Sequence, residues 1–399
     1  MRYARIGTLA AVAGGLILWA LRISPVWAQA HRPVVEQAPQ KAGQVVEVKA
    51  LLSGLAVDKP RAYKNMLVFP IRFDGKQVPG EWEAMDRAVA AGHLRILEKE
   101  QAAVSDVQIE NVSDKTIFLM SGEIIKGGKQ TRVIRKDTIL EARQRATVPV
   151  FCVEQHRWRG DVKFQSSSNL APASINQAMK AGEGQAEVWS RVEERARAMG
   201  APASPTASLD DALDSDRAKK EFENLHKQLG KFSPAETIGI AIADARTGRV
   251  IGLEVFGRRD LFENLQDKLV EGYASDLVLA RAGQSDAEAR VAVSERQVLE
   301  FIQKALSGAS QYESTPGSGR GIDLSSGQSD VAQGRPEFHR TGGDLHGKGV
   351  GLLEMAVHLS IQETHPLVMP ARPIVDDRPV PQLVPLPRAI PPPRPPVER

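Results

Sequence analysis

The chain has 399 residues, which at roughly 100–200 residues per domain allows one large domain or two small ones. Its 42% hydrophobic content excludes a collagen and an acidic disordered chain. Its single cysteine, Cys152, excludes an internal disulfide framework. The formal charge of +3 falls to zero (3 − 3 = 0) without Arg2, Arg5 and Arg22 at the N-terminus, so we expect no nucleic-acid partner.

Residues 1–28 have the order of a secretory signal peptide. Arg2 and Arg5 precede an uncharged stretch over residues 6–21, and small residues at a cleavage site follow up to Ala28. This predicts export to the periplasm or the cell exterior. The alternative is an uncleaved anchor in the inner membrane, although the stretch is shorter than the ~20 residues that a spanning helix needs.

Residues 29–44 are polar and are interpreted as a linker, and the first half of the body that follows is rich in strand patterns. Residues 66–72 (MLVFPIR) predict a strand, and residues 82–91 have helical spacing. Residues 104–110 and 116–120 flank turn-forming residues and predict a hairpin. Further strands are predicted over residues 133–140 and 147–153.

The second half of the body alternates between helix and strand patterns. Helices are predicted over residues 186–199, from an N-cap at Ser208 to Leu229 with a break, and over residues 261–279 and 293–306. Residues 236–244 and 249–256 predict a second hairpin. Residues 307–334 are rich in Gly and Ser and are predicted to be mostly loop, and residues 349–361 return to a strand-like composition.

Residues 366–399 form a proline-rich tail. Twelve of these 34 residues are proline and five are arginine. Proline lacks an N–H and fixes φ, so we expect polyproline II or disorder in this segment. It is interpreted as a solvated tail, and a protein partner for it remains an alternative.

The order of elements predicts an α+β fold, with an antiparallel β-rich core and helices packed on one side. The chain is therefore divided into a signal peptide (1–28), a linker (29–44), a single large domain (45–365) and a disordered proline-rich tail (366–399).

Two polar blocks carry the candidate chemistry. In the first, a strand ends at Met120 and a glycine-bearing segment follows, with Glu123, Lys129, Gln130 and Arg132. Glycines let backbone N–H groups converge, and Lys129 and Arg132 add cationic donors, so this segment can hold a phosphate or a carboxylate. The alternative is a bend between strands with solvated charges.

The second block follows the strand over residues 147–153. Glu154, Gln155, Arg157 and Trp158 lie at its end, where polar side chains can be held rigidly yet exposed. Glu154 can act as a general base or pair with an arginine, and Trp158 can stack on a base or a sugar. The alternative is a structural ion pair with a core tryptophan. Cys152 lies among apolar residues and is interpreted as a buried core residue rather than a nucleophile.

Four stretches in this order resemble the ARG and rhodanese-phosphatase-superfamily-associated domain, in which ARG means ADP-ribosylglycohydrolase. They are residues 65–73 (NMLVFPIRF), 118–133 (FLMSGEIIKGGKQTRV), 148–158 (VPVFCVEQHRW) and 249–256 (RVIGLEVF). The resemblance covers residues 45–363 and implies, by association only, a role near NAD or ADP-ribose metabolism. Family members usually carry Asp at the position of Ser121 and Asn at that of Thr131, which weakens this implication.

Three functions remain open at this point. The first is a module that binds an anionic, ADP-ribose-like or nucleotide-like ligand through Lys129, Gln130, Arg132, Gln155, Arg157 and Trp158. The second is a hydrolase that uses Glu123 and Glu154 as its acid–base pair. The third is a structural envelope protein that acts through its proline-rich tail. We expect the two blocks to meet in space, whichever function holds.

A metal site has little support, because His339 and His346 match no ligand spacing, and no cofactor is indicated. Whether the protein is an enzyme remains open.

Overall fold

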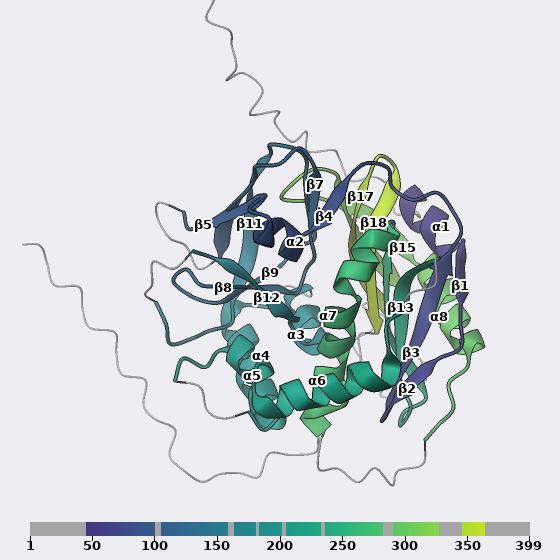
Figure 1. The fold of residues 1–399 in the computed structure, drawn as a ribbon. Coiled ribbons are helices and arrows are strands. Elements are labelled where there is room, and N and C mark those ends of the chain that lie inside the picture. Colours follow the sequence, from purple (N-terminus) through teal and green to yellow (C-terminus); the bar gives the residue numbers. More distant parts are fainter. Residues whose placement is uncertain are drawn as a thin grey trace, which may run out of the picture. The chain divides into compact units, whose positions relative to one another are not determined.

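The computed structural model describes residues 45–99, 105–158, 163–180, 183–201, 205–232, 236–281, 290–326 and 345–363. These residues form eight α-helices and 18 strands in three sheets (Figure 1). All strand pairs are antiparallel except one, so the predicted α+β class with an antiparallel β-rich core is confirmed. The predicted signal peptide, linker and proline-rich tail lie outside the described residues. Among the described helices, none is both long enough and apolar enough to cross a membrane.

The largest sheet has nine strands and combines both ends of the described chain. Its order is β1 (Leu55–Val57), β3 (Met66–Phe73), β13 (Thr237–Asp244), β14 (Arg249–Phe256), β18 (Met355–Glu363), β17 (Leu345–Leu352), β16 (Arg320–Ser326) and β15 (Ala309–Glu313), with β2 (Arg61–Tyr63) paired to β3. The strand predicted over residues 66–72 is β3, and the hairpin predicted over residues 236–256 is β13–β14, so both are confirmed.

The prediction of mostly loop over residues 307–334 is wrong, because this segment forms the strands β15 and β16. Its glycines mark close approaches to neighbouring segments, both within β16 and in the turn that precedes it. A Cβ on Gly321 would lie 2.7 Å from Glu313 Cγ on the neighbouring strand, and one on Gly317 would lie 2.0 Å from the carbonyl oxygen of Ile139.

Helices cover both faces of this sheet, whereas the sequence predicted them on one side. Along β13, Ile240 and Ile242 pack in the core beneath α7 (Arg259–Leu277). Ile238 and Ala241 belong to a second core with α1 (Val46–Leu52) and α8 (Glu295–Ser307). A strand buried on both faces reads as a continuous apolar run, which is what β13 shows.

Two smaller sheets enclose a third core. The six-stranded sheet has the order β12 (Gln165–Leu170), β8 (Glu123–Lys126), β9 (Arg132–Ile134), β11 (Arg145–Cys152), β6 (Asp106–Asn111) and β5 (Leu94–Leu97). The three-stranded sheet has the order β10 (Thr138–Leu140), β7 (Thr116–Leu119) and β4 (Trp82–Ala84). Ile109, Ile117 and Val148 are among the residues buried in this core.

The prediction of a hairpin over residues 104–120 is also wrong, because its two strands, β6 and β7, lie in different sheets. The residues between the two strands do form a turn, but this turn leads the chain into the other sheet instead of back along β6. The buried Asn111 side chain donates from Nδ2 to the carbonyl oxygens of Lys115, Leu140 and Glu141 at 2.7–3.2 Å, and its Oδ1 accepts from the Ser113 amide at 2.9 Å. These bonds fix the crossing between the two sheets.

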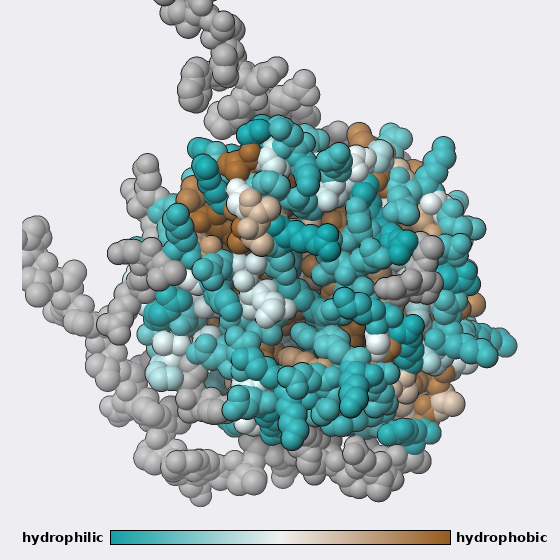
Figure 2. Space-filling view, in the orientation of Figure 1, coloured by the Kyte–Doolittle hydropathy of each residue, from teal (hydrophilic) through white to brown (hydrophobic). Residues whose placement is uncertain are grey.

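Five helices remain. In the sequence, α2 (Met85–Ala90) follows β4, and four helices follow one another between β12 and β13: α3 (Ala173–Lys180), α4 (Gln185–Ala198), α5 (Leu209–Leu213) and α6 (Asp216–Leu229). The Ser208 side chain caps α5 by accepting from the Asp211 amide, as predicted. The helix predicted over residues 82–91 is only partly present, since Trp82–Ala84 pairs in parallel with β7. Figure 2 shows hydrophilic residues over most of one face, with apolar residues in small patches.

Candidate functional site

The two polar blocks meet in space, as predicted. Cys152 on β11 pairs with Arg132 on β9, and Nη1 of Arg157 donates to the carbonyl oxygen of Gly128 at 2.9 Å. The backbone amide of Thr131 donates to Oε2 of Glu154 at 2.8 Å. The second block therefore lies directly against the glycine-bearing segment of the first.

Glu154 is the centre of this contact. It is buried, and it accepts from Nε and Nη2 of Arg157 at 2.8 and 2.7 Å. The Gln130 side chain donates to its backbone carbonyl at 3.0 Å. Burial alone would raise the pKa of Glu154, but the hydrogen bonds from Arg157 and Thr131 outweigh it and hold that pKa below its ordinary value. Glu154 and Arg157 thus neutralise each other within the fold.

The other predicted binding residues divide into buried and accessible ones. Arg132 is fully buried, and its Nη2 donates to both Glu98 oxygens at 3.0 Å. Lys129 Nζ lies 5.3 Å from the ring centre of Trp158, which is 47% exposed. Gln155 is exposed. Of the six predicted residues, Lys129, Gln155 and Trp158 remain available to a ligand, while the side chains of Gln130, Arg132 and Arg157 contact the protein.

Glu123, the other predicted catalytic carboxylate, lies in a separate ion pair. It is 0% exposed, accepts from the Met120 amide at 2.8 Å and lies 3.5 Å from Nζ of Lys268, which also pairs with Asp86 at 2.5 Å. Burial raises the pKa of Glu123 to about 7. Neither Glu123 nor Glu154 lines any of the cavities described below, so the geometry gives an acid–base pair no support.

Cys152 is buried and unpaired by any disulfide, in line with the core position expected for it. Its Sγ contacts the carbonyl oxygen of Glu154 at 3.2 Å, and burial raises its pKa above the ordinary value for a thiol. A thiol in this state is a poor nucleophile.

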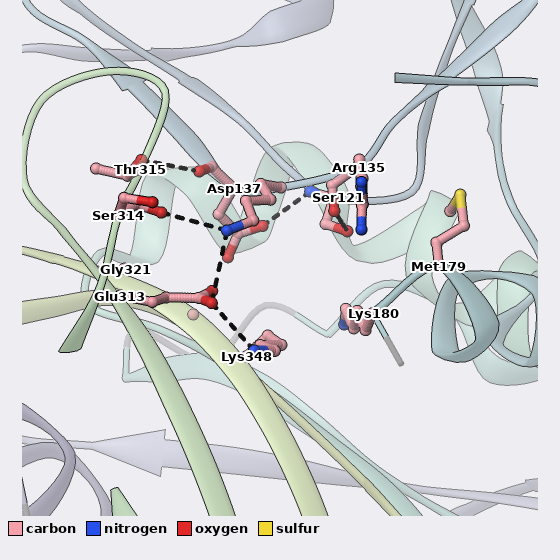
Figure 3. A pocket seen from close by; sticks show the side chains of 12 residues that line it. Ser121, Arg135, Asp137, Met179, Lys180, Glu313, Ser314, Thr315, Gly321 and Lys348 are labelled. Atoms are coloured by element: carbon pink, nitrogen blue, oxygen red, sulfur yellow. Dashed lines mark hydrogen bonds and ion pairs between the residues drawn. The ribbon is translucent and has the colours of Figure 1, made fainter. Parts of the chain in front are cut away.

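A cavity that the sequence did not reveal opens where the nine-stranded sheet meets the smaller sheets and the end of α3 (Figure 3). Its volume is about 160 Å³. Segments far apart in sequence line it: Ser121, Arg135, Lys136, Asp137, Met179, Lys180, Glu313, Ser314, Thr315, Gly321, Lys348 and Gly349.

Four cations and two carboxylates face this cavity. Lys136 and Lys348 share Oε2 of Glu313, at 3.5 and 3.1 Å. Arg135 stacks on the ring of Phe151 at 5.1 Å, and Lys180 donates to the Ser360 hydroxyl at 2.6 Å. Within the described ranges, neither Arg135 nor Lys180 has a carboxylate within ion-pair distance, and Figure 3 shows both apart from Glu313, toward Met179.

Beneath the cavity, His358 lies between two buried carboxylates. Its Nδ1 is 2.7 Å from Oδ2 of Asp137, and its Nε2 is 3.3 Å from Oε2 of Glu254. Burial alone would lower the pKa of His358, but Asp137 and Glu254 outweigh it and raise that pKa to about 9. The same pairing holds the pKa of Asp137 below its ordinary value against the opposite effect of burial. His358 is therefore a buried imidazolium at neutral pH.

The network extends from Glu254 to a second, small cavity of about 10 Å³. Oε1 of Glu254 accepts from the hydroxyls of Tyr273 and Ser360, both at 2.8 Å. Ser121 and Lys180 line both cavities, so the larger one is connected to this polar network.

The sequence contains a signal for this network. His358 and Glu254 stand alone in apolar runs, AVHLSI and GLEVF, that become the central strands β18 and β14. A charged residue in a strand buried on both faces needs a partner, so such residues indicate buried polar contacts. Asp137 could not be predicted as the partner of His358, because it lies in a loop 221 residues away in the sequence.

A third cavity, of about 390 Å³, lies beside the second block, between α4 and α5. Gln155 and His156 form part of its wall, and alanine and valine side chains form much of the rest. Among the described residues, no group of three or more His, Cys, Asp or Glu side chains is arranged to hold a metal ion.

Comparison with known families identifies the class of protein. The family model for the ARG and Rhodanese-Phosphatase-superfamily-associated Protein domain matches residues 54–360. The chain belongs to this family, which confirms the resemblance drawn from its motifs. No curated protein and no solved structure gives a significant match.

Proposed function

We propose that this protein is a binding module for an anionic ligand, and that the ligand's charged group occupies the cavity lined by Arg135, Lys136, Lys180 and Lys348. The observation that carries the proposal is the pair of cations, Arg135 and Lys180, that face the cavity without an ion-pair partner among the described residues. Cations that face a cavity without an ion-pair partner of their own favour an anion from outside.

The polar blocks support this choice of cavity by contrast. Arg157 is neutralised by Glu154, and Arg132 is paired with Glu98. Their charge is neutralised by direct ion pairs, whereas Arg135 and Lys180 have no direct ion-pair partner among the described residues, and Lys180 acts on Asp137 only at longer range, where it helps to lower the pKa of that carboxyl.

The size of the cavity limits what enters it. Sites for whole drug-sized ligands measure roughly 300–1,000 Å³, whereas this cavity measures about 160 Å³. It therefore suits a group of the size of a phosphate. For an ADP-ribose-like or nucleotide-like ligand, a phosphate would enter and the nucleoside would stay outside. We further propose that the module acts after export, on the basis of residues 1–28.

The two alternatives have less support. A hydrolase based on Glu123 and Glu154 requires a shared pocket, and each carboxylate lies in its own ion pair. A role through the proline-rich tail concerns residues outside the described ranges.

The test is ligand-dependent stabilisation of the full chain. Inorganic phosphate, ADP-ribose, NAD, nucleotides and sugar phosphates are added, and a ligand at about 100 times its dissociation constant should stabilise the fold by roughly 2.7 kcal/mol. We expect Arg135→Gln/Lys180→Gln to lose this effect. The matched control, Arg87→Gln/Lys227→Gln, removes the same charge from exposed positions and should keep it. Binding that is unchanged in the cavity variant, or absent for every compound in the wild type, would overturn the proposal.

A further inference from the structure

The cavity contains a carboxylate whose second oxygen is free. Both lysine contacts of Glu313 go to Oε2. Across the described part of the chain, Oε1 of Glu313 has no hydrogen-bond partner. Glu313 lies at the end of β15, among the residues that line the cavity, and its side chain is 25% exposed. Arg135, Lys180 and Glu313 therefore line one cavity, and Oε1 of Glu313 is an acceptor that the described part of the protein leaves unused.

The position of Glu313 is fixed from two sides. Lys348 contacts both Glu313 and Asp323, at 3.1 and 3.0 Å, and Lys136 contacts Glu313 and the carbonyl oxygen of Ser314. Burial alone would lower the pKa of Lys348, but the two carboxylates outweigh it and keep the ammonium charged. The carboxylate of Glu313 is thus held in the wall of a cavity that four cations and Asp137 also line.

A carboxylate in an anion site makes the site selective for anions that can donate a hydrogen bond. Ionised Glu313 can only accept a hydrogen bond. It repels an oxyanion that has no proton, such as sulfate, and it accepts a short, charge-assisted hydrogen bond from an oxyanion that carries an O–H. Specificity of this kind combines an attractive contact to one ligand with a repulsive contact to its competitor.

We infer that Glu313 makes this site selective for oxyanions that carry their own hydroxyl donor, and that it rejects sulfate. The donor can be the P–OH of hydrogen phosphate or a hydroxyl of a sugar that bears the phosphate. The inference rests on the proposed function, because it specifies the ligand of the same cavity.

The experiment compares inorganic phosphate with sulfate on the full-length chain by titration calorimetry at pH 8. Wild type should bind phosphate at least about tenfold more tightly than sulfate, the factor that one charge-assisted hydrogen bond supplies. Glu313→Gln should reduce this ratio to about twofold, mainly by binding sulfate more tightly, because an amide can turn its N–H toward the anion. The variant should fold, since Lys348 keeps Asp323 as a partner.

Glu110→Gln is the matched control. It removes a carboxylate of similar exposure, 23%, that pairs with Arg145 outside the cavity, and it should keep the wild-type ratio. Two phosphate esters then identify the donor. At pH 8 a phosphate monoester has lost its last proton, because its second pKa is about 6. Ribose 5-phosphate binding more tightly than methyl phosphate would assign the sugar hydroxyl, whereas equal binding of the two esters, both weaker than that of hydrogen phosphate, would assign the P–OH.

The outcomes separate the two proposals. If neither phosphate nor sulfate binds the wild type, this inference is overturned, and the proposed function fails as well when no compound of the stabilisation test binds. If both bind the wild type with equal affinity, or if Glu313→Gln keeps the wild-type ratio, the inference alone is overturned and the anion site stands.

Discussion

The buried ion pair between His358 and Asp137 makes the stability of the fold fall as the pH rises above neutrality. The pKa of His358 is raised from 6.5 to about 9 in the folded protein. A group with a raised folded pKa stabilises the fold fully below its unfolded pKa, and this contribution is lost as the pH rises through the folded value. A difference of 9 − 6.5 = 2.5 units, at 1.36 kcal/mol per unit, gives a loss of about 3 kcal/mol between pH 6 and pH 9.

Two measurements on the full chain check this prediction. Urea unfolding at pH 6, 7, 8 and 9 gives the free energy of unfolding, and an NMR titration of the His358 imidazole gives its pKa directly. Asp137→Asn provides the comparison, because it removes the main partner that raises the pKa of His358. The pKa of His226 is also raised, by its hydrogen bond to Glu271, so part of the fall with pH should persist in this variant.

A free energy of unfolding that stays level from pH 6 to pH 9 would refute the reasoning. So would an imidazole that titrates near 6.5 in the wild type, since His358 would then carry no charge at neutral pH. A pH dependence that is identical in the wild type and in Asp137→Asn would place its origin elsewhere.

Two further predictions concern a buried ion pair and a close backbone approach. Glu154→Gln removes the carboxylate that binds Arg157 and should lower the free energy of unfolding by about 2 kcal/mol, whereas Glu110→Gln, measured beside it in urea, should change it by less than about 0.5 kcal/mol. An equal effect of both would show that the Glu154 contact is not structural. Gly317→Ala places a Cβ 2.0 Å from the carbonyl oxygen of Ile139 and should cost at least about 2 kcal/mol. A melting temperature equal to that of the wild type would contradict this close approach.

Local patterns predicted the elements well, because they depend on residues that are near in sequence. The apolar run of β3, the N-cap at Ser208 and the hairpin β13–β14 follow from side-chain spacing and turn chemistry. Pairing across the fold did not follow from them. The turn near Asn111 has the composition of a hairpin turn. The Asn111 side chain, however, donates to the carbonyl oxygens of Leu140 and Glu141, and the chain enters another sheet.

The candidate site divides in the same way. The two polar blocks could be predicted because each is a dense run of polar residues, and each lies against the other as expected. The cavity could not be predicted, because its residues stand singly in distant segments that only the sheet pairing assembles. Glu313 illustrates this, since it lies in a stretch whose Gly and Ser content indicated loop, whereas the stretch forms an edge strand.

The interleaving of early and late strands has a consequence for how the chain acquires its structure. β3 lies between the early strands β1 and β2 and the much later strand β13, and its residue Met66 pairs with Asp244 on β13. Asp137 and His358 meet across 221 residues. Folding must therefore close long loops before the central contacts can stabilise the fold, and this slows folding. During synthesis the apolar β3 is left without its partner strand β13 until that strand has been made. The residues that line the cavity run from Ser121 to Gly349, so capture of a ligand that requires the complete cavity would report that strands from distant parts of the chain have assembled.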